Sequence, residues 1–331
     1  MEDQKNTNHI KKNSTSKLNR AIAAVSCVIL LVVIVLFILI IEVFIPNSKD
    51  KKQASAGKDT ENLLATSEQD DTAETEGTDV SEEESEPETQ QEYQAVQIPN
   101  VESLDNTSHG WGQGTQFDEL NRPGGCLSYQ EKYGKYNANF IGENKQTIYL
   151  TFDEGYENGC TPAILDTLKA KGVKAVFFVT QPFAEQNPDL VRRMIDEGHT
   201  VGNHSVTHPS DGLPSQTLED QRQEIMGCHQ YIKDNFGYSM HLFRYPAGKF
   251  SEQSLAFLNN CNYKSVFWSF AYLDYDVNNQ PDQGQALQKV VERLHPGAIY
   301  LLHAVSATNT AILGDFIDQA QAKGYTFEAF Y

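Results

Sequence analysis

Seven polar side chains stand where apolar runs of the sequence end. They are Asp153 and Glu154 after "TIYLTF", His204 and His208 in "GNHSVTH", Arg244 in "LFRYPAG", Asp274 in "WSFAYLDY" and His303 in "AIYLLHA". Each of these groups can titrate, bind a metal or make several hydrogen bonds. If the apolar runs are parallel strands, their carboxyl ends meet at one rim, where active sites of such folds lie. We therefore expect these side chains to surround one site.

These residue types suit metal-assisted hydrolysis of an acyl bond. Two histidines and a carboxylate can hold a metal and leave positions open for water. A second carboxylate can act as the base for that water, while His303 protonates the departing group. Asp274 can hold the other ring nitrogen of His303, and Arg244 can form a bidentate pair with Asp153. Backbone N–H groups around residues 246–248 can stabilise an oxyanion.

Each group also has a structural interpretation, and other functions remain open. A single histidine at a strand end is often only a hydrogen-bonding residue. The H-x-x-x-H spacing by itself is weak evidence for a metal site. Asp153 or Glu154 could instead cap a helix. A glycosidase needs two acids about 5 Å or more apart across the bond, which adjacent residues meet poorly. A wall-binding protein without activity would keep its affinity for glycan after the loss of Asp153 or His303.

The elements that must position these residues alternate between strand and helix. Apolar runs predict strands over 147–152, 174–180, 199–203, 241–245, 264–270, 297–303 and 325–330. Helix patterns cover 160–172, 187–198, 217–237, 251–262, 286–297 and 309–324. In the first helix we expect Thr161 as the cap, Pro162 in the first turn and Gly172 at the end. This alternation predicts an α/β fold, a distorted barrel of about seven parallel strands covered by helices. No G-x-G-x-x-G or P-loop pattern follows the first strand, which argues against a nucleotide cofactor.

The first third of the 331-residue chain has a different composition. Residues 1–20 are basic and predict a cytoplasmic tail, and residues 21–45 predict an uncleaved single-pass transmembrane anchor, because 21–41 carry no charge. A cleaved signal peptide is the alternative. Residues 46–105 predict a disordered linker, since twelve acids and no Lys or Arg lie between Glu68 and Glu92. The catalytic domain would then lie outside the membrane.

Most of the net charge of −19 belongs to this linker, and the acidity gives no support to nucleic-acid binding. We expect residues 106–146 to form a lead-in segment that packs on a catalytic domain of residues 147–331. Four cysteines of this part lack the spacing of a zinc site, and the sequence leaves open whether they form disulfides. They are Cys126, Cys160, Cys228 and Cys261.

The motifs follow one another as in a known family. "TFDEG", "HSVTH", "RYPAG", "LDY" and "LLH" resemble the five motifs of the polysaccharide deacetylases, the NodB-homology group known as carbohydrate esterase family four. The resemblance covers residues 147–331 and implies a NodB-like barrel. It implies that Asp153 is the base and His303 the acid, with Arg244 and Asp274 assisting them.

The same resemblance implies a cofactor and a binding groove. The cofactor would be a divalent metal, Zn²⁺ first and Co²⁺ or Ni²⁺ as alternatives, and three side chains would hold it. These are Glu154, His204 and His208. The residues expected to contact the substrate or its oxyanion are Ala247, Trp268 and Tyr275.

Within the family, "TFDEGYENG", "VFWSFAYLDY" and "GAIYLLHAVSATNTAI" most resemble the muramic-acid deacetylases. Those enzymes remove acetyl from N-acetylmuramic acid on the way to the δ-lactam of spore cortex peptidoglycan. The resemblance implies glycan strands without stem peptides as substrate, with N-acetylglucosamine, chitin oligomers or xylan as alternatives.

Three positions depart from the family pattern. Glu154 stands where the family has Asp and where the muramic group commonly has Asn, so a metal could sit differently. Tyr245 replaces the first Pro of its motif, and Tyr275 replaces a Trp of the sugar groove. None of these changes removes the base, the histidine pair or the acid, so we expect an active enzyme rather than a degenerate sugar-binding module.

Overall fold

The computed structural model of the protein describes residues 93–330. The predicted cytoplasmic tail (1–20), the predicted anchor (21–45) and the linker up to residue 92 lie outside the described residues. Within the described range, no helix is both long enough and apolar enough to span a membrane.

The described residues form eight α-helices and ten strands. The helices are α2 (Gly124–Tyr133), α3 (Thr161–Lys171), α4 (Gln181–Gln186), α5 (Pro188–Asp196), α6 (Leu218–Phe236), α7 (Glu252–Asn260), α8 (Gln283–Glu292) and α9 (Ala307–Ala322). The strands are β1 (His109–Gly110), β2 (Ala138–Asn139), β3 (Thr147–Glu154), β4 (Val176–Val179), β5 (Thr200–Asn203), β6 (Leu242–Phe243), β7 (Lys249–Phe250), β8 (Lys264–Val266), β9 (Ala298–His303) and β10 (Thr326–Phe327). Each predicted strand and helix region contains the expected element, whereas α2 and α4 were not predicted.

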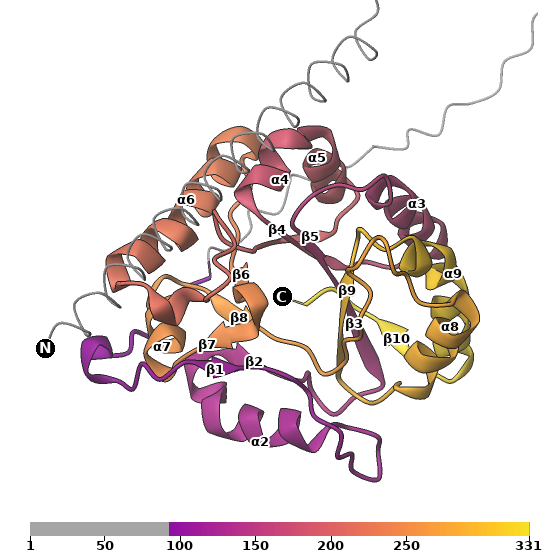
Figure 1. The fold of residues 1–331 in the computed structure, drawn as a ribbon, viewed down its shortest axis with the longest axis horizontal. Helices are drawn as coiled ribbons and strands as arrows, with labels where there is room; N and C mark the ends of the chain where they lie inside the picture. The colour runs from indigo at the N-terminus through magenta and orange to yellow at the C-terminus, as the bar shows by residue number, and fades with distance from the viewer. Residues whose placement is uncertain (1–92, 331) are drawn as a thin grey trace, which may run out of the picture. The chain divides into compact units, whose positions relative to one another are not determined.

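The main sheet is parallel and curls into a distorted barrel, which confirms the predicted fold class. The strand order is β10, β3, β4, β5, β6, β8, β2. Strand β9 lies off this path and also pairs with β3 in parallel, over Ile148–Asp153. The chain after β8 returns to β9, where Phe270 and Tyr300 form a parallel bridge that closes the ring. Figure 1 shows the helices arranged around these strands.

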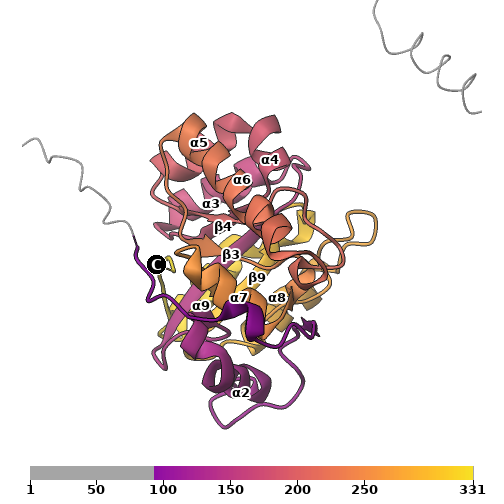
Figure 2. The same cartoon turned by 90° about the vertical axis from the view of Figure 1, so that its left-hand side faces the viewer.

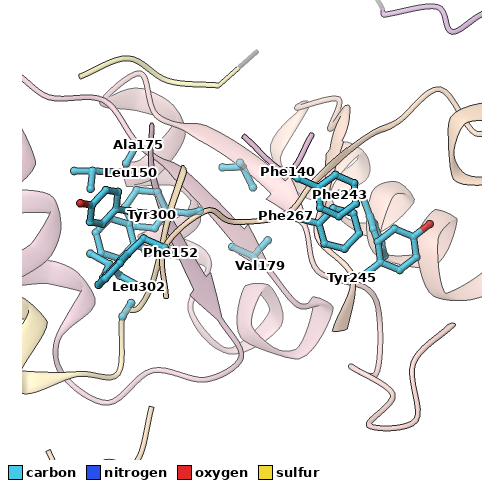
Figure 3. Packing of buried hydrophobic residues seen from close by; sticks show 14 of the residues in the cluster. Phe140, Leu150, Phe152, Ala175, Val179, Phe243, Tyr245, Phe267, Tyr300 and Leu302 are labelled. Carbon is cyan, nitrogen blue, oxygen red and sulfur yellow. The ribbon is translucent and has the colours of Figure 1, made fainter. Parts of the chain in front are cut away.

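Side chains of β3 alternate between two apolar layers. Ile148, Leu150 and Phe152 belong to the main core, which lies between the strands and the helices. A smaller cluster fills the barrel interior and includes Phe178 of β4, with Tyr149 packed against it. Figure 3 shows Leu150 and Phe152 close together in the main core. The two faces of β3 therefore lead to two different environments at its carboxyl end.

The segment before β3 is an integral part of the fold. β2 adds a parallel strand beside β8, and Phe140 stacks on Phe267 with ring centroids 4.3 Å apart. The 90° view in Figure 2 shows α2 on the side of the domain away from α4 and α5. The predicted linker 46–105 extends too far, because its last residues bind to α7. For example, the Ile98 N–H donates to Asn260 Oδ1 at 2.7 Å.

The start of α3 differs from the prediction. Thr161 is the first residue of the helix, and Cys160 occupies the cap position without a side-chain cap bond. Pro162 lies in the first turn, and Gly172 ends the helix in the left-handed conformation at φ 65°. The Thr161 hydroxyl is thereby free to bind acidic side chains instead of a helix N–H.

Candidate active site

Asp153 lies at the carboxyl end of β3 and points into the barrel mouth. Its register partner on β4 is Phe178 of the interior cluster, and its partner on β9 is His303. Arg244 Nη1 donates to Asp153 Oδ1 at 2.9 Å. Burial alone would raise the pKa of Asp153, but the charge of Arg244, followed by His204 and His303, outweighs it and lowers that pKa. The carboxylate is therefore ionised and able to accept a proton.

Arg244 is fully buried and its guanidinium is held on every side. Nε donates to Val266 O at 3.0 Å and Nη2 to Phe267 O at 3.1 Å, while Nη1 also donates to Thr151 Oγ1 at 2.7 Å. The group also lies 4.3 Å from the centre of the Phe178 ring. The predicted bidentate pair with Asp153 is therefore wrong, because only one nitrogen reaches that carboxylate and the others bind the barrel backbone.

His204 and His208 come together beside Asp153. Their ring centroids are 4.7 Å apart, and His204 Nε2 lies 3.5 Å from Asp153 Oδ2. His204 Nδ1 contacts the Arg244 carbonyl at 2.9 Å, so it carries the proton and leaves the Nε2 lone pair facing the mouth. Burial lowers the pKa of His204 to about 4, and the ring is neutral at neutral pH. Ser205 and His208 have positive φ values of 73° and 51°, the kind of backbone strain that functional sites accumulate.

Glu154 does not join the histidines. Its register partner is Val179 of the main core, so its side chain lies on the helix-covered face, opposite to Asp153. There it is fully buried, and the Thr161 hydroxyl donates to its two oxygens at 3.4 Å. Thr161 also contacts Glu157. Burial, and then the charges of Glu157 and Asp153, raise the pKa of Glu154 well above its ordinary value.

The predicted metal set of Glu154, His204 and His208 is thus not assembled. Among residues 93–330, no group of three or more His, Cys, Asp and Glu side chains is placed to hold a metal ion. The physical reason is the strand period of two residues, which sends the neighbours Asp153 and Glu154 to opposite faces while β5 aims His204 into the barrel. These residues do not fit a three-ligand metal centre.

His303 forms a tight pair with Asp274 at the end of β9. Its Nδ1 lies 2.7 Å from Asp274 Oδ1, and its backbone N–H donates to Oδ2 at 2.9 Å. Burial alone would lower the pKa of His303. The hydrogen bond and the charge of Asp274, together with the charge of Asp153, outweigh burial and raise that pKa. The Nδ1 contact leaves Nε2 free to donate a proton.

The remaining predicted residues line the same rim. Tyr275 is exposed, and its ring centre lies 5.5 Å from that of His303. Trp268 is half-buried and has its ring centre 6.0 Å from the Arg244 guanidinium. Ala247 is exposed with φ 53°, while the next N–H, that of Gly248, donates to Tyr245 O within the same turn. Ala247 is therefore the exposed position of the turn.

Tyr245 does not disturb the loop that presents Arg244. Its φ of −66° is the value that proline imposes, so tyrosine and proline fit the same backbone here. The ring is buried and stacks on Phe267 with centroids 5.6 Å apart. Figure 3 shows Tyr245 beside Phe267 and Phe243 in the core. This departure from the family pattern is a change in core packing.

Thr151 is a residue of the site that the sequence reasoning missed. Its hydroxyl donates to Tyr300 O at 2.6 Å and accepts a hydrogen bond from Arg244. The period of two residues along β3 could have indicated it, because Thr151 shares the face of Asp153. The four cysteines of the described range are free thiols, which answers the question of disulfides for Cys126, Cys160, Cys228 and Cys261.

Comparison with known proteins places this arrangement in a family. The model of the family "Polysaccharide deacetylase" matches residues 141–266. The chain is 43% identical over 197 residues to Peptidoglycan-N-acetylmuramic acid deacetylase PdaA of Bacillus subtilis, a match that covers 59% of this chain and 74% of that relative. It is 34% identical over 185 residues to Peptidoglycan-N-acetylglucosamine deacetylase PgdA of Listeria monocytogenes, covering 56% of this chain and 38% of that relative.

A solved structure gives the same result. The structure of Bacillus subtilis PdaA, described as a family 4 carbohydrate esterase, superposes with a TM-score of 0.64 at 38% identity and covers 68% of this chain and 96% of that one. The first three motifs that suggested the family lie in the region matched by the family model. The side chains of Asp153, Arg244, His204 and His303 meet at one rim of the barrel. The chain belongs to the polysaccharide deacetylases of carbohydrate esterase family four and is a deacetylase of that hydrolase family.

Proposed function

We propose that the protein removes the N-acetyl group from N-acetylmuramic acid in peptidoglycan, as in the δ-lactam pathway of spore cortex. The observation that carries this proposal is the pairing of an ionised Asp153 with His303 on the neighbouring strand, in a chain 43% identical to a muramic acid deacetylase. The relative named for N-acetylglucosamine is the less similar of the two, at 34% identity, which favours muramic acid over glucosamine, chitin or xylan.

The reaction follows from the chain's own side chains. The Asp153 carboxylate accepts a proton from a water molecule, while the oxygen of that water attacks the carbonyl carbon of the acetyl group. The negative charge that develops on the carbonyl oxygen can be stabilised by the N–H of the exposed Ala247. His303 then donates its Nε2 proton to the amide nitrogen, the C–N bond breaks, and acetate and a free amine leave. Asp274 holds the His303 ring in the orientation that this transfer needs.

The residues Tyr275 and Trp268 would form the sugar-binding wall of the site. Both offer aromatic surface at the rim, and Tyr275 lies directly against His303. Polysaccharide deacetylases are generally metal-dependent, so a divalent metal such as Zn²⁺, Co²⁺ or Ni²⁺ remains part of the proposal. Because the predicted ligand set is not assembled here, no step of the reaction is assigned to it.

We further propose that the deacetylase is held at the outer face of the cell membrane by residues 21–45, with the N-terminus in the cytoplasm. The uncharged run from 21 to 41, the basic residues before it and the acidic linker after it support this arrangement. A wall glycan would then be within reach of the tethered domain.

The direct test is acetate release by the purified full-length protein. We expect acetate from glycan strands that an amidase has freed of stem peptides, and mass spectrometry should place the new amine on the muramic acid residue. An amine on glucosamine instead would show the alternative sugar. No acetate from either substrate, with or without added Zn²⁺ or Co²⁺, would contradict the proposal.

A further inference from the structure

Asn309 on α9 has a buried side chain that the proposed reaction does not use. It is 2% exposed, and its Nδ2 donates to Asp274 Oδ2 at 2.6 Å. The same nitrogen lies 3.3 Å from the backbone carbonyl of His303. Asn309 therefore contacts both members of the pair that prepares the acid, although it lies in a different element.

The donors around Asp274 divide between its two oxygens. Oδ1 receives the ring of His303, while Oδ2 accepts the backbone N–H of His303 and the amide of Asn309. A carboxylate can rotate about its terminal torsion, which is broad and roughly two-fold. Two donors on Oδ2 oppose that rotation and keep Oδ1 aimed at the imidazole.

The amide of Asn309 is itself oriented by its neighbours. The Tyr272 hydroxyl donates to Asn309 Oδ1, so the NH₂ group must face Asp274. Burial, together with the charge of Asp274, raises the pKa of Tyr272 and keeps that hydroxyl protonated. At the backbone, the Asn309 N–H donates to the Ser306 hydroxyl that caps α9. The position of Asn309 is thus fixed by the first turn of the helix.

We infer that Asn309, oriented by Tyr272, is a positioning residue for the acid of the deacetylation: it holds Asp274 so that His303 presents its Nε2 proton to the leaving nitrogen. An aspartate in its place could accept but not donate, and it would set a second carboxylate against Asp274. The requirement is therefore for an amide donor and not for a polar side chain of this size. The inference rests on the deacetylase reaction and holds for either sugar.

Steady-state kinetics of the full-length protein test this role. The replacement Asn309→Leu removes the amide donor and keeps a side chain of similar volume. We expect kcat to fall about 10-fold or more, roughly 1.4 kcal/mol in activation free energy, with KM unchanged. In the Asp274→Asn background the same replacement should have no further effect, because Asn309 acts only through that carboxylate. Asp315→Asn on the exposed face of α9 is the matched control and should leave kcat unchanged.

Two results would overturn the inference. One is a folded Asn309→Leu protein with normal kcat, and the other is a loss that adds in full to that of Asp274→Asn. If Asn309→Leu does not fold, Tyr272→Phe decides, since it removes only the hydroxyl that orients the amide. We expect Tyr272→Phe to lower kcat at constant KM, and an unchanged kcat would refute the role. Assays on both muramic strands and chitin oligomers keep this outcome separate from an error in the proposed sugar.

Discussion

The carboxylate of Asp153 stays charged although the residue is buried, with only 8% of its surface exposed. An isolated ion at such a depth would take up a proton, because burial disfavours the charged form. Arg244 prevents this with one charged hydrogen bond from Nη1, which also donates to Thr151, while Nε and Nη2 donate to backbone carbonyls. The second oxygen of Asp153 is left toward His204 and the open mouth. A base with one oxygen anchored and one available is what water activation requires.

The first prediction concerns that oxygen. Asp153→Asn keeps the shape of the side chain but removes the proton acceptor, so we expect kcat for acetate release to fall by about 10²–10⁴-fold. The metal content of the purified variant, measured by inductively coupled plasma mass spectrometry, should stay near that of the parent protein. Activity close to that of the parent would show that another group is the base.

The pH dependence provides a second prediction. The base must be ionised and its pKa is lowered, whereas the acid His303 must be protonated and its pKa is raised. With increasing pH, kcat/KM should therefore rise at pH values below the ordinary pKa of an aspartate. It should fall again only at pH values above the ordinary pKa of a histidine. In Asp274→Asn the cause of the raised pKa is lost and burial remains, so the alkaline limb should move to lower pH. An unmoved limb would separate Asp274 from the acid.

Glu154 leads to a third prediction, which has a readout in stability. Its pKa is raised in the folded state, so its contribution to stability is complete below the unfolded pKa and is lost as pH rises through the folded pKa. Glu154→Gln stays neutral, and its free energy of unfolding should decline less than that of the parent protein above about pH 4.3. Each unit of pKa difference corresponds to about 1.4 kcal/mol.

Metal content is the companion measurement for Glu154→Gln. Because the side chain lies beneath α3 and not beside His204, the replacement should leave the bound metal per chain unchanged. His204→Ala is the comparison variant, since its Nε2 faces the mouth. A loss of metal in Glu154→Gln would restore Glu154 to the ligand set.

At the scale of elements, the sequence was informative wherever the pattern is local. Apolar runs located all seven predicted strands, and the period of two residues correctly sent Asp153 and Glu154 to different faces. Which face holds the histidines depends on the register of β5 against β4, a non-local pairing that no run of residues reveals. The strands β1, β2 and β7 were missed because they do not lie in longer apolar runs, unlike the equally short β6 and β10.

The lead-in segment provides a fourth prediction at this scale. Phe140 follows β2, is fully buried and stacks on Phe267, so Phe140→Ala should lower the free energy of unfolding by about 3–5 kcal/mol. Phe117→Ala in the same segment is the control. Phe117 is 37% exposed and contacts Arg293, so we expect a loss below about 1 kcal/mol. Urea unfolding of both variants measures the difference, and equal losses would mean that Phe140 does not anchor the segment.

At the scale of the whole molecule, the parts of the chain differ sharply in composition. The described residues 93–330 form the deacetylase domain, and the apolar run from 21 to 41 precedes an acidic stretch with twelve acids between Glu68 and Glu92. The composition of this stretch predicts an extended tether, and it lies outside the described residues. The anchor remains a prediction from composition, because it lies outside the described residues.

The fifth prediction tests that anchor. The full-length protein should stay in the membrane fraction after carbonate washing, and a phosphatase fused to its C-terminus should be active outside the cell. The double replacement Leu31→Arg and Leu36→Arg should release the protein from the membrane, because each charge near the centre of a spanning helix costs about 2.5–3.5 kcal/mol. The control places the same two arginines at Ser48 and Ser55, beyond the apolar run. A soluble parent protein that has lost the apolar run 21–41 would instead support a cleaved signal peptide.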